Sequence, residues 1–259
     1  MHVYIYDSFL AHKKYDKVLA TIETRITDLG LNGKIDRLGP MKNIKSMVEN
    51  EIKRGVKTIV AVGNDHTVNE VINAITVFDR LKLYKNVPLG IIPIGKENNV
   101  IAESLGISGE EDACNILSAR RIEELDLGLA NNRFFLLEAT IASQGTTIEI
   151  NQTYSIEIMD KGEISIINLP NKNLTSNKAS FSPQDGILEL LIRTKKSGGF
   201  LKIGGEKIGE SVFSLKKLAV HNNKNQPIIL DGCIEIPAPA EISVIKQKIN
   251  VIVGKERNF

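Results

Sequence analysis

The residues Thr58–Ala74, TIVAVGNDHTVNEVINA, contain the clearest structural pattern in the chain. The first five are β-branched or apolar and predict a buried strand. A polar turn follows from Gly63 to His66, and from Thr67 onward apolar side chains recur at helical spacing. A strand, a tight turn and a helix in this order direct backbone N–H groups and the positive end of the helix at an anion. The pattern therefore indicates a phosphate site, and a turn of the same shape that binds nothing is the alternative.

Strands and helices alternate on both sides of this stretch as far as about residue 120. We predict strands at 3–6, 34–38 and 88–92, and helices at 15–29, 41–52, 101–105 and 113–117. Such alternation predicts a three-layer α/β domain with a mostly parallel sheet covered on both faces. Ligands bind these sheets beyond the carboxyl ends of the strands, where the turns at Gly63 and Gly95 are expected.

From about Ile122 the pattern changes to short strands separated by turns rich in Gly, Asn and Pro. The predicted strands are 134–139, 146–150, 155–159, 164–168, 187–193, 216–221, 228–230 and 242–253. No long helix is predicted here, so we expect a C-terminal antiparallel β-sandwich-like domain. The expected boundaries are 1–122 for the α/β domain, 123–243 for the β-rich domain and 244–259 for a final segment.

The composition is ordinary for a soluble globular protein. Of 259 residues, 42% are hydrophobic and 25% are charged, and the net charge of +2 indicates no nucleic-acid partner. Cys114 and Cys233 make neither a disulfide framework nor a metal cluster, which favours a reducing cytoplasm. We expect no signal peptide, and no apolar stretch approaches the ~18 residues of a transmembrane helix.

Five short motifs follow one another between about residues 58 and 240. They are GNDHTVNEV (63–71), PIGKENN (93–99), DLG (126–128), QDGILE (184–189) and DGC (231–233). The first two resemble GGDGTxNEV and PxGTxND of the diacylglycerol kinase catalytic family, and the last two resemble its DDGxLDV and DGE. That family includes bacterial lipid kinases and sphingosine kinases and is related to NAD kinases.

The resemblance implies ATP-dependent phosphoryl transfer to a hydroxyl of diacylglycerol or a related lipid, with Mg²⁺ bridging the phosphates. It also implies a nucleotide domain, a β-rich substrate domain, an active-site cleft between them and a final segment that returns to the first domain. The lipid would be met at the membrane surface, so we expect a cytoplasmic protein with peripheral membrane contact. The oligomeric state stays open, with a homodimer as one alternative.

The resemblance also implies roles for individual residues. Asp65 and Asp231 are the implied catalytic residues: Asp65 orients the loop, and Asp231 is the general base for the lipid hydroxyl. Asp185 is implied in a metal-linked network, and Asn99 stands at a substrate-binding position. The implied nucleotide-binding residues are Gly63, Asn64, His66, Thr67, Gly95, Lys96 and Asn98. The alternatives are a helix N-cap at Asp65, a solvated lysine at Lys96, and plain turns at Asp185 and Asp231.

Several positions depart from the family pattern. Asn64 and His66 replace two glycines, and because both residue types tolerate positive φ we expect an unchanged backbone path with side chains filling phosphate space. Lys96 replaces a Thr, Asn99 replaces an Asp, and Cys233 replaces an acidic residue whose charge a thiol does not carry at neutral pH. The first-strand NPxxG is also absent, with Tyr6-Asp7-Ser8 in its place.

Most retained positions shape the backbone, and most lost positions would touch ligand. This distribution predicts a lipid kinase with weakened or altered activity. The alternative from another class is a catalytically silent homologue that binds lipid or a protein partner, and an NAD kinase is a weaker alternative.

Overall fold

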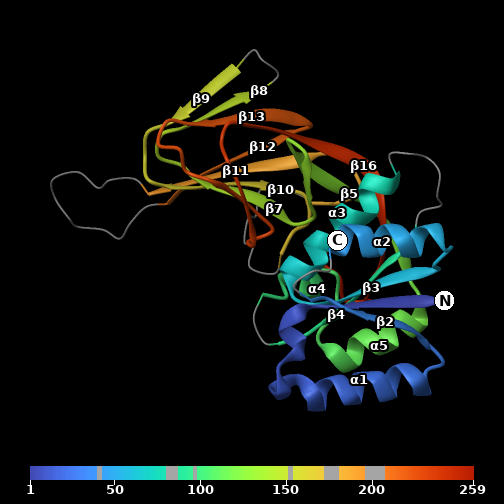
Figure 1. Ribbon diagram of the computed structural model, residues 1–259. Helices are drawn as coiled ribbons and strands as arrows, with labels where there is room; N and C mark the ends of the chain where they lie inside the picture. The colour runs from blue at the N-terminus through green and yellow to red at the C-terminus, as the bar shows by residue number, and fades with distance from the viewer. Residues whose placement is uncertain (40–42, 80–86, 96–97, 151–153, 172–180, 196–207) are drawn as a thin grey trace. The chain divides into compact units, whose positions relative to one another are not determined.

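The computed structural model describes residues 1–39, 43–79, 87–95, 98–150, 154–171, 181–195 and 208–259 of the chain (Figure 1). These residues form two compact units. The first unit comprises Met1–Leu125 and Gln247–Asn258, and the second comprises Asp126–Lys246 and Phe259.

The first unit is built on a parallel sheet in the strand order β2-β1-β3-β4. Its strands are β1 (His2–Tyr6), β2 (Gly33–Arg37), β3 (Thr58–Gly63) and β4 (Leu89–Pro93). The end of β16 (Ala240–Ile252) adds to this sheet, pairing Val251 in parallel with Leu89 of β4. Every residue of β3 and β4 is buried, as expected for central parallel strands covered on both faces.

Helices cover both faces of this sheet (Figure 1). On one face α1 (Asp16–Asp28) packs with α5 (Glu110–Ala119), and on the other α2 (Ile44–Lys53) packs with α3 (Asp65–Asp79). Shorter helical turns are η1 (Ser8–Ala11), η2 (Lys13–Tyr15) and α4 (Val100–Ser104). The predicted three-layer α/β arrangement is confirmed, although α3 begins two residues before the predicted Thr67.

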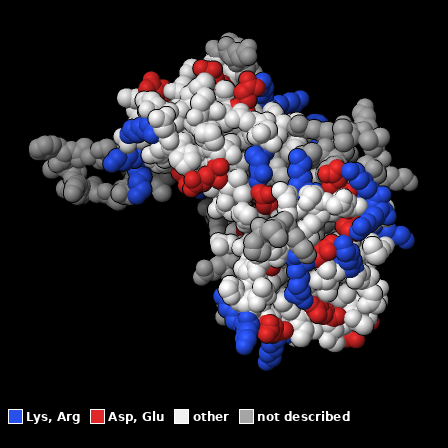
Figure 2. All heavy atoms as spheres, viewed as in Figure 1, with Lys and Arg blue, Asp and Glu red and all other residues white. Residues whose placement is uncertain are grey.

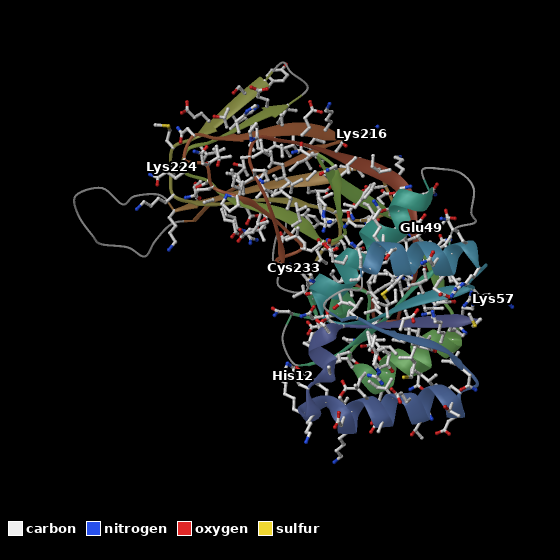
Figure 3. All side chains as sticks on the ribbon, in the orientation of Figure 1. His12, Glu49, Lys57, Lys216, Lys224 and Cys233 are labelled. Atoms are coloured by element: carbon white, nitrogen blue, oxygen red, sulfur yellow. The ribbon has the colours of Figure 1, made fainter. Side chains whose placement is uncertain are left out.

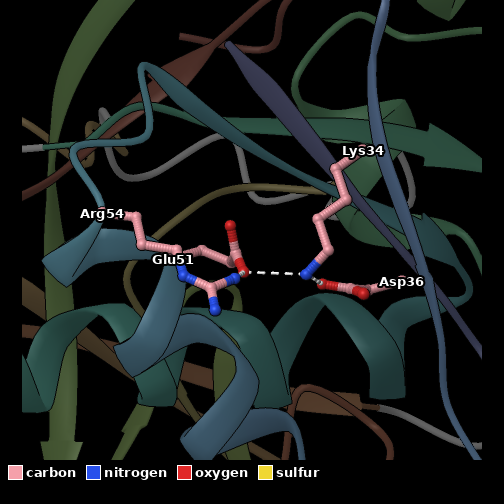
Figure 4. A network of polar contacts seen from close by, with 4 residues as sticks. All are labelled: Lys34, Asp36, Glu51 and Arg54. Atoms are coloured by element: carbon pink, nitrogen blue, oxygen red, sulfur yellow. Dashed lines mark hydrogen bonds and ion pairs between the residues drawn. The ribbon is translucent and has the colours of Figure 1, made fainter.

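An ion-pair network joins the edge strand β2 to helix α2 (Figure 4). Lys34 Nζ donates to Asp36 Oδ2 at 2.7 Å and to Glu51 Oε1 at 2.8 Å, and Arg54 Nη1 donates to the same Glu51 oxygen at 2.7 Å. Hydrogen bonds to Asp36 and Glu51 raise the pKa of Lys34. Because Glu51 is only 2% exposed, these two cations offset the cost of burying its charge and hold α2 against the strand.

The second unit consists of two antiparallel sheets packed face to face. One contains β13 (Lys217–Asn222), β8 (Thr146–Ile150), β9 (Tyr154–Ile158) and the first part of β16. The other has the order β12-β11-β10-β7-β14-β15. Its strands are β12 (Ile208–Leu215), β11 (Leu188–Lys195), β10 (Gly162–Ile167), β7 (Glu138–Ala142), β14 (Ile228–Leu230) and β15 (Ile234–Ile236).

The core between these sheets takes side chains from both. Ile148 and Val220 come from the first sheet, and Ile166 and Leu190 come from the second. The sandwich predicted from the short-strand pattern is therefore confirmed. Within the described residues no helix is long and apolar enough to span a bilayer.

Some strand predictions were wrong. The predicted strand 134–139 is two strands, β6 (Arg133–Phe135) and β7, because the chain turns at Leu136 and Leu137 to bind a carboxylate described below. Three strands were not predicted, namely β5 (Ile122–Ala130), β12 and β15. β15 has only three residues, and β5 and β12 are interrupted by polar residues or glycine, so none produced a clear apolar run.

Two strands, β5 and β16, continue from one unit into the other. After β16, residues 253–258 bind the first unit: Val253 N donates to Arg121 O at 2.9 Å, and Gly254 N donates to Leu105 O at 2.8 Å. Arg257 and Glu123 form an ion pair at 2.9 Å. The last turn of the chain is thus fixed to helix α4 and strand β5 of the first unit.

Candidate functional site

The turns of the first two motifs lie side by side at the carboxyl ends of β3 and β4. The two strands are neighbours, with Gly63 opposite Pro93. Ile94 N donates to Gly63 O at 2.9 Å, and Asp65 N donates to Asn98 O at 2.8 Å. The backbone therefore joins two motifs that are 30 residues apart in the sequence, at the edge where ligands bind such sheets.

Asp65 is the main side-chain link between these turns. It is 4% exposed, and its carboxylate accepts the N–H of Val100 at 2.8 Å and that of Ile101 at 3.0 Å, at the start of α4. Asn64, rather than Asp65, caps α3: its Oδ1 accepts Thr67 N at 3.3 Å and its carbonyl accepts Val68 N at 3.1 Å. The cap predicted as an alternative role for Asp65 thus belongs to its neighbour.

Thr67 is fully buried and its hydroxyl donates to Asp7 Oδ2 at 2.5 Å. Asp7 follows β1, and sequence reasoning assigned it no role although it lies where the family motif is missing. A Cβ at Gly63 would lie 2.4 Å from Thr67 Oγ1 and 3.2 Å from Asp7 Cβ. Glycine is therefore required at position 63 by this close packing and not by a positive φ.

Asn64 and His66 do not adopt positive φ, although both residue types tolerate it. Neither is among the positive-φ residues, because His66 already belongs to α3 and Asn64 caps that helix. Positive φ instead occurs in the second turn, at Gly95 (96°) and Asn98 (60°). A Cβ at Gly95 would have no atom within 4 Å, so this turn borders open space.

Two backbone N–H groups at the start of α3 could bind an anion. Asp65 N and Thr67 N are used within the chain. The N–H groups of Asn64 and His66 have no acceptor among the described residues. Since backbone donors do not depend on the side chain, the loss of two family glycines leaves this capacity for binding an anion in place.

The remaining residues of the second motif are partly placed. Asn99 Nδ2 donates to Gly95 O at 2.9 Å and so closes the loop on itself. Lys96 lies outside the described residues, and its predicted contact with nucleotide stays a prediction.

The three downstream motifs come together at one end of the second unit. Asp126 is fully buried, its Oδ2 accepts Gly186 N at 2.6 Å, and its N–H donates to Pro183 O at 2.7 Å. Asn168 Nδ2 donates to Asp126 O at 3.0 Å and to Leu136 O at 2.8 Å. The motif residues thus hold one another through backbone contacts.

Asp231 anchors the turn between β6 and β7. It has a φ of 49° and is 3% exposed. Its carboxylate accepts Leu136 N at 3.0 Å, Leu137 N at 2.7 Å and Glu138 N at 3.3 Å. Charge-assisted bonds of this kind stabilise the ionised carboxylate and favour a structural role. The general-base role of Asp231 stays a prediction.

Cys233, which replaces the family acid, is half-buried in the turn after β14 (Figure 3).

Asp185 is exposed and forms a local turn, with its Oδ1 accepting Ile187 N at 2.9 Å. Gly186 has a φ of 75° and packs so closely on Lys246 that an added Cβ would meet its Cε. In the part of the chain that the structure describes, no three His, Cys, Asp or Glu side chains could together hold a metal ion. The metal role of Asp185 stays a prediction.

Sequence reasoning missed two acidic residues near these motifs. Glu189 is 3% exposed, and burial, followed by the charge of Asp185, raises its pKa to about 7. Glu138 is half-buried, and this burial raises its pKa. A hydrogen bond with Ser165 lowers the pKa, whereas the negative charges of Glu163 and Asp231 raise it further. Glu189 could have been selected from the sequence, because it is the last residue of the QDGILE motif.

Comparison with known proteins agrees with the motif order. The family model for the diacylglycerol kinase catalytic domain matches residues 2–130. The chain carries a domain of the diacylglycerol kinase catalytic family. A diacylglycerol kinase of Bacillus subtilis strain 168 is 24% identical, over 77% of this chain and 78% of that protein.

Solved structures of diacylglycerol kinase proteins share the fold. One from Bacillus anthracis strain Sterne superposes with a TM-score of 0.76 at 16% identity, covering 98% of this chain and 97% of the other. Another from the same organism has a TM-score of 0.74 at 17% identity, with the same coverage. These likenesses extend over both units and confirm the α/β plus β architecture.

The residues present fit the nucleotide that a diacylglycerol kinase domain uses. The N–H groups of Asn64 and His66, which have no acceptor among the described residues, and the open space at Gly95 are features that suit phosphate oxygens. Mg²⁺ is commonly held by one or two carboxylates together with substrate phosphates. Asp185 is exposed and has one oxygen outside its turn hydrogen bond, so it is chemically suited to such a ligand role.

Proposed function

We propose that the protein is an ATP-dependent lipid kinase that phosphorylates a hydroxyl of diacylglycerol or a related lipid, with weakened or altered activity. The observation that carries the proposal is the pair of N–H donors at Asn64 and His66, next to the open turn at Gly95. The family match over residues 2–130 supports the same reaction. The lipid would be reached at the membrane surface by a cytoplasmic protein, and a homodimer stays a prediction.

In this proposal the first unit holds the nucleotide. Asn64 N and His66 N bind phosphate oxygens, and the turns at Gly95 and Asn98 allow close approach of the backbone. Thr67 stabilises the loop, because its buried hydroxyl donates a hydrogen bond to Asp7. Lys96 adds a cation toward the phosphates, and Mg²⁺, with Asp185 as a ligand, spreads their charge.

The altered activity follows from side chains in this loop. His66 is exposed at the start of α3, and Asn64 is half-buried beside it. Both would lie where the family has glycine and phosphate oxygens approach. Changing both to Gly is therefore expected to tighten Mg²⁺–ATP binding, by about threefold or more for ~0.7 kcal/mol of relieved crowding.

Calorimetric titration of Mg²⁺–ATP into both proteins tests this expectation. A control variant with His12→Gly and Asn32→Gly changes the same residue types at exposed loop positions of the first unit. Thermal melts are needed alongside, because Asn64 caps α3. Equal affinities of the wild type and the Asn64→Gly, His66→Gly variant would reject the crowding explanation.

A silent homologue is the second candidate. It is favoured by the anchoring bonds of Asp231 and by Cys233 in place of an acid. Failure of the wild type to bind Mg²⁺–ATP, together with retained binding of dioctanoylglycerol, would select this candidate over the kinase.

A further inference from the structure

A cavity of about 520 Å³ opens on the second unit, along strands β8, β13 and β16. All of its lining residues belong to this unit, and the structure describes each of them. A volume of this size is typical of sites for small molecules. Charged side chains of both signs are interspersed over the second unit on the face shown in Figure 2. The ligand that the cavity fits therefore depends on the local arrangement of its own charges.

The register of three strands creates the hollow. Ala219 of β13 pairs with Glu149 of β8 on one side and with Glu241 of β16 on the other. Directly opposed residues point to the same face of a sheet, and this is the outer face because Leu218 and Val220 belong to the core. The single methyl group of Ala219 thus lies between two longer side chains that end in carboxylates. The row is low at its centre and acidic at both ends.

Apolar groups form the bottom and one side of the hollow. Ala219 is partly exposed at the bottom, and Pro239 lines the side next to β16. Asn131 is fixed beside the same strand, because its N–H donates to Glu241 O at 2.8 Å and its Oδ1 accepts Glu241 N at 3.0 Å. The wall is therefore held by backbone contacts and is present without a ligand.

The charges around the hollow do not balance. Lys217 and His221 lie two residues from Ala219 on either side along β13, so they share its outer face. Lys217 Nζ pairs with Glu241 Oε2 at 2.8 Å. His221 Nε2 lies 3.6 Å from Glu149 Oε2, beyond hydrogen-bond distance, and an imidazole is charged only when protonated.

Glu149 thus has no lysine or arginine partner in the part of the chain that the structure describes. Two carboxylates face one permanent cation, Lys217, which leaves one negative charge in excess. The side chain of Glu149 is 47% exposed, so a ligand in the hollow can reach its carboxylate.

We propose that this hollow binds a small organic cation, a primary ammonium group on a short alkyl chain. The ammonium group pairs with Glu149, and the chain lies on Ala219 against Pro239. Such a ligand supplies the missing positive charge and covers apolar surface that water otherwise contacts. The inference goes beyond the proposed kinase function and does not depend on it, because the hollow contains no residue of the five sequence motifs.

NMR titration of the ¹⁵N-labelled protein with hexylamine tests the proposal. Hexanol and hexanoate carry the same alkyl chain with no charge and with a negative charge, so they separate the contribution of the ammonium group. Amide shifts at Glu149, Ala219 and His221 locate the site. The variants are Glu149→Gln, which removes the carboxylate, and Ala219→Leu, which fills the hollow.

Glu157→Gln is the matched control, because Glu157 is an exposed acid of β9 in the same sheet and does not line the cavity. Thermal melts establish that each variant is folded.

We expect hexylamine to bind with a Kd of about 1 mM, as a ligand of this size allows. Hexanol should bind at least about fivefold more weakly, and Glu149→Gln should weaken hexylamine binding by about fivefold, the equivalent of one exposed charge pair. Ala219→Leu should weaken it by about tenfold or more, because the larger side chain occupies the place of the alkyl chain. Glu157→Gln should match the wild type.

Equal affinities for hexylamine and hexanol would overturn the proposal, as would a folded Glu149→Gln variant with unchanged hexylamine affinity. Tighter binding of hexanoate would assign the hollow to anions and reject a cation site. Shifts that leave Glu149, Ala219 and His221 unaffected at about ten times the expected Kd would show that the amine binds elsewhere or not at all, and would likewise reject the site.

Discussion

Replacement of Asp65 by Ala tests how the two nucleotide motifs are joined. The carboxylate accepts two backbone N–H groups, from Val100 at 2.8 Å and from Ile101 at 3.0 Å, and is almost fully buried. Bonds to a charged acceptor contribute about 1.5–3 kcal/mol each, so the Ala variant should lose ~3 kcal/mol of stability in the first unit. Asp65→Asn keeps one acceptor atom and should lose about half as much.

Denaturant unfolding followed by tyrosine fluorescence measures this loss. The protein has no Trp, and four of its five Tyr residues precede residue 85, so the signal reports chiefly on the first unit. Amide exchange should be about a hundredfold faster at Val100 and Ile101, the rate equivalent of ~3 kcal/mol. Asp16→Ala is the control, because Asp16 is an exposed acid in the first turn of α1. A loss below ~1 kcal/mol in Asp65→Ala, or unchanged exchange at both amides, would refute the capping role.

Three further outcomes are expected. Gly63→Ala should lower the stability by about 1–3 kcal/mol, because the added Cβ would lie 2.4 Å from Thr67 Oγ1. Gly39→Ala is the control: an added Cβ there has no atom within 4 Å, so thermal melts of this variant should match the wild type. The pKa of Glu189 is raised in the folded state, so the folded protein binds this proton more tightly than the unfolded chain does. The contribution of Glu189 to the free energy of unfolding therefore falls as the pH rises from about 4.5 to about 7. Denaturant titrations across that window should show Glu189→Gln gaining stability relative to the wild type. Asp231→Asn should lower the melting temperature of the second unit, because an amide N–H would face backbone N–H donors, and an unchanged melt would contradict the anchoring role.

The sequence alone was sufficient for the fold class and for the order of the motifs. The apolar run 58–62 and the alternation around it predict a parallel sheet, because buried strands and amphipathic helices leave direct periodic signals. Likewise, the short strands after residue 122 predict a sandwich, since turn residues separate them at regular intervals. These signals are local, so no knowledge of tertiary contacts is needed to detect them.

The roles of individual polar residues were decided only by tertiary structure. Asp65 binds the start of a helix 35 residues later, and Asp231 binds a turn 93–95 residues earlier in the chain. Glu189 differs from an ordinary strand residue because its environment excludes water and, among the residues that the structure describes, supplies no partner for one of its oxygens. Hydrogen bonds and desolvation depend on what surrounds a side chain in space, and residues that are distant in the sequence supply those surroundings.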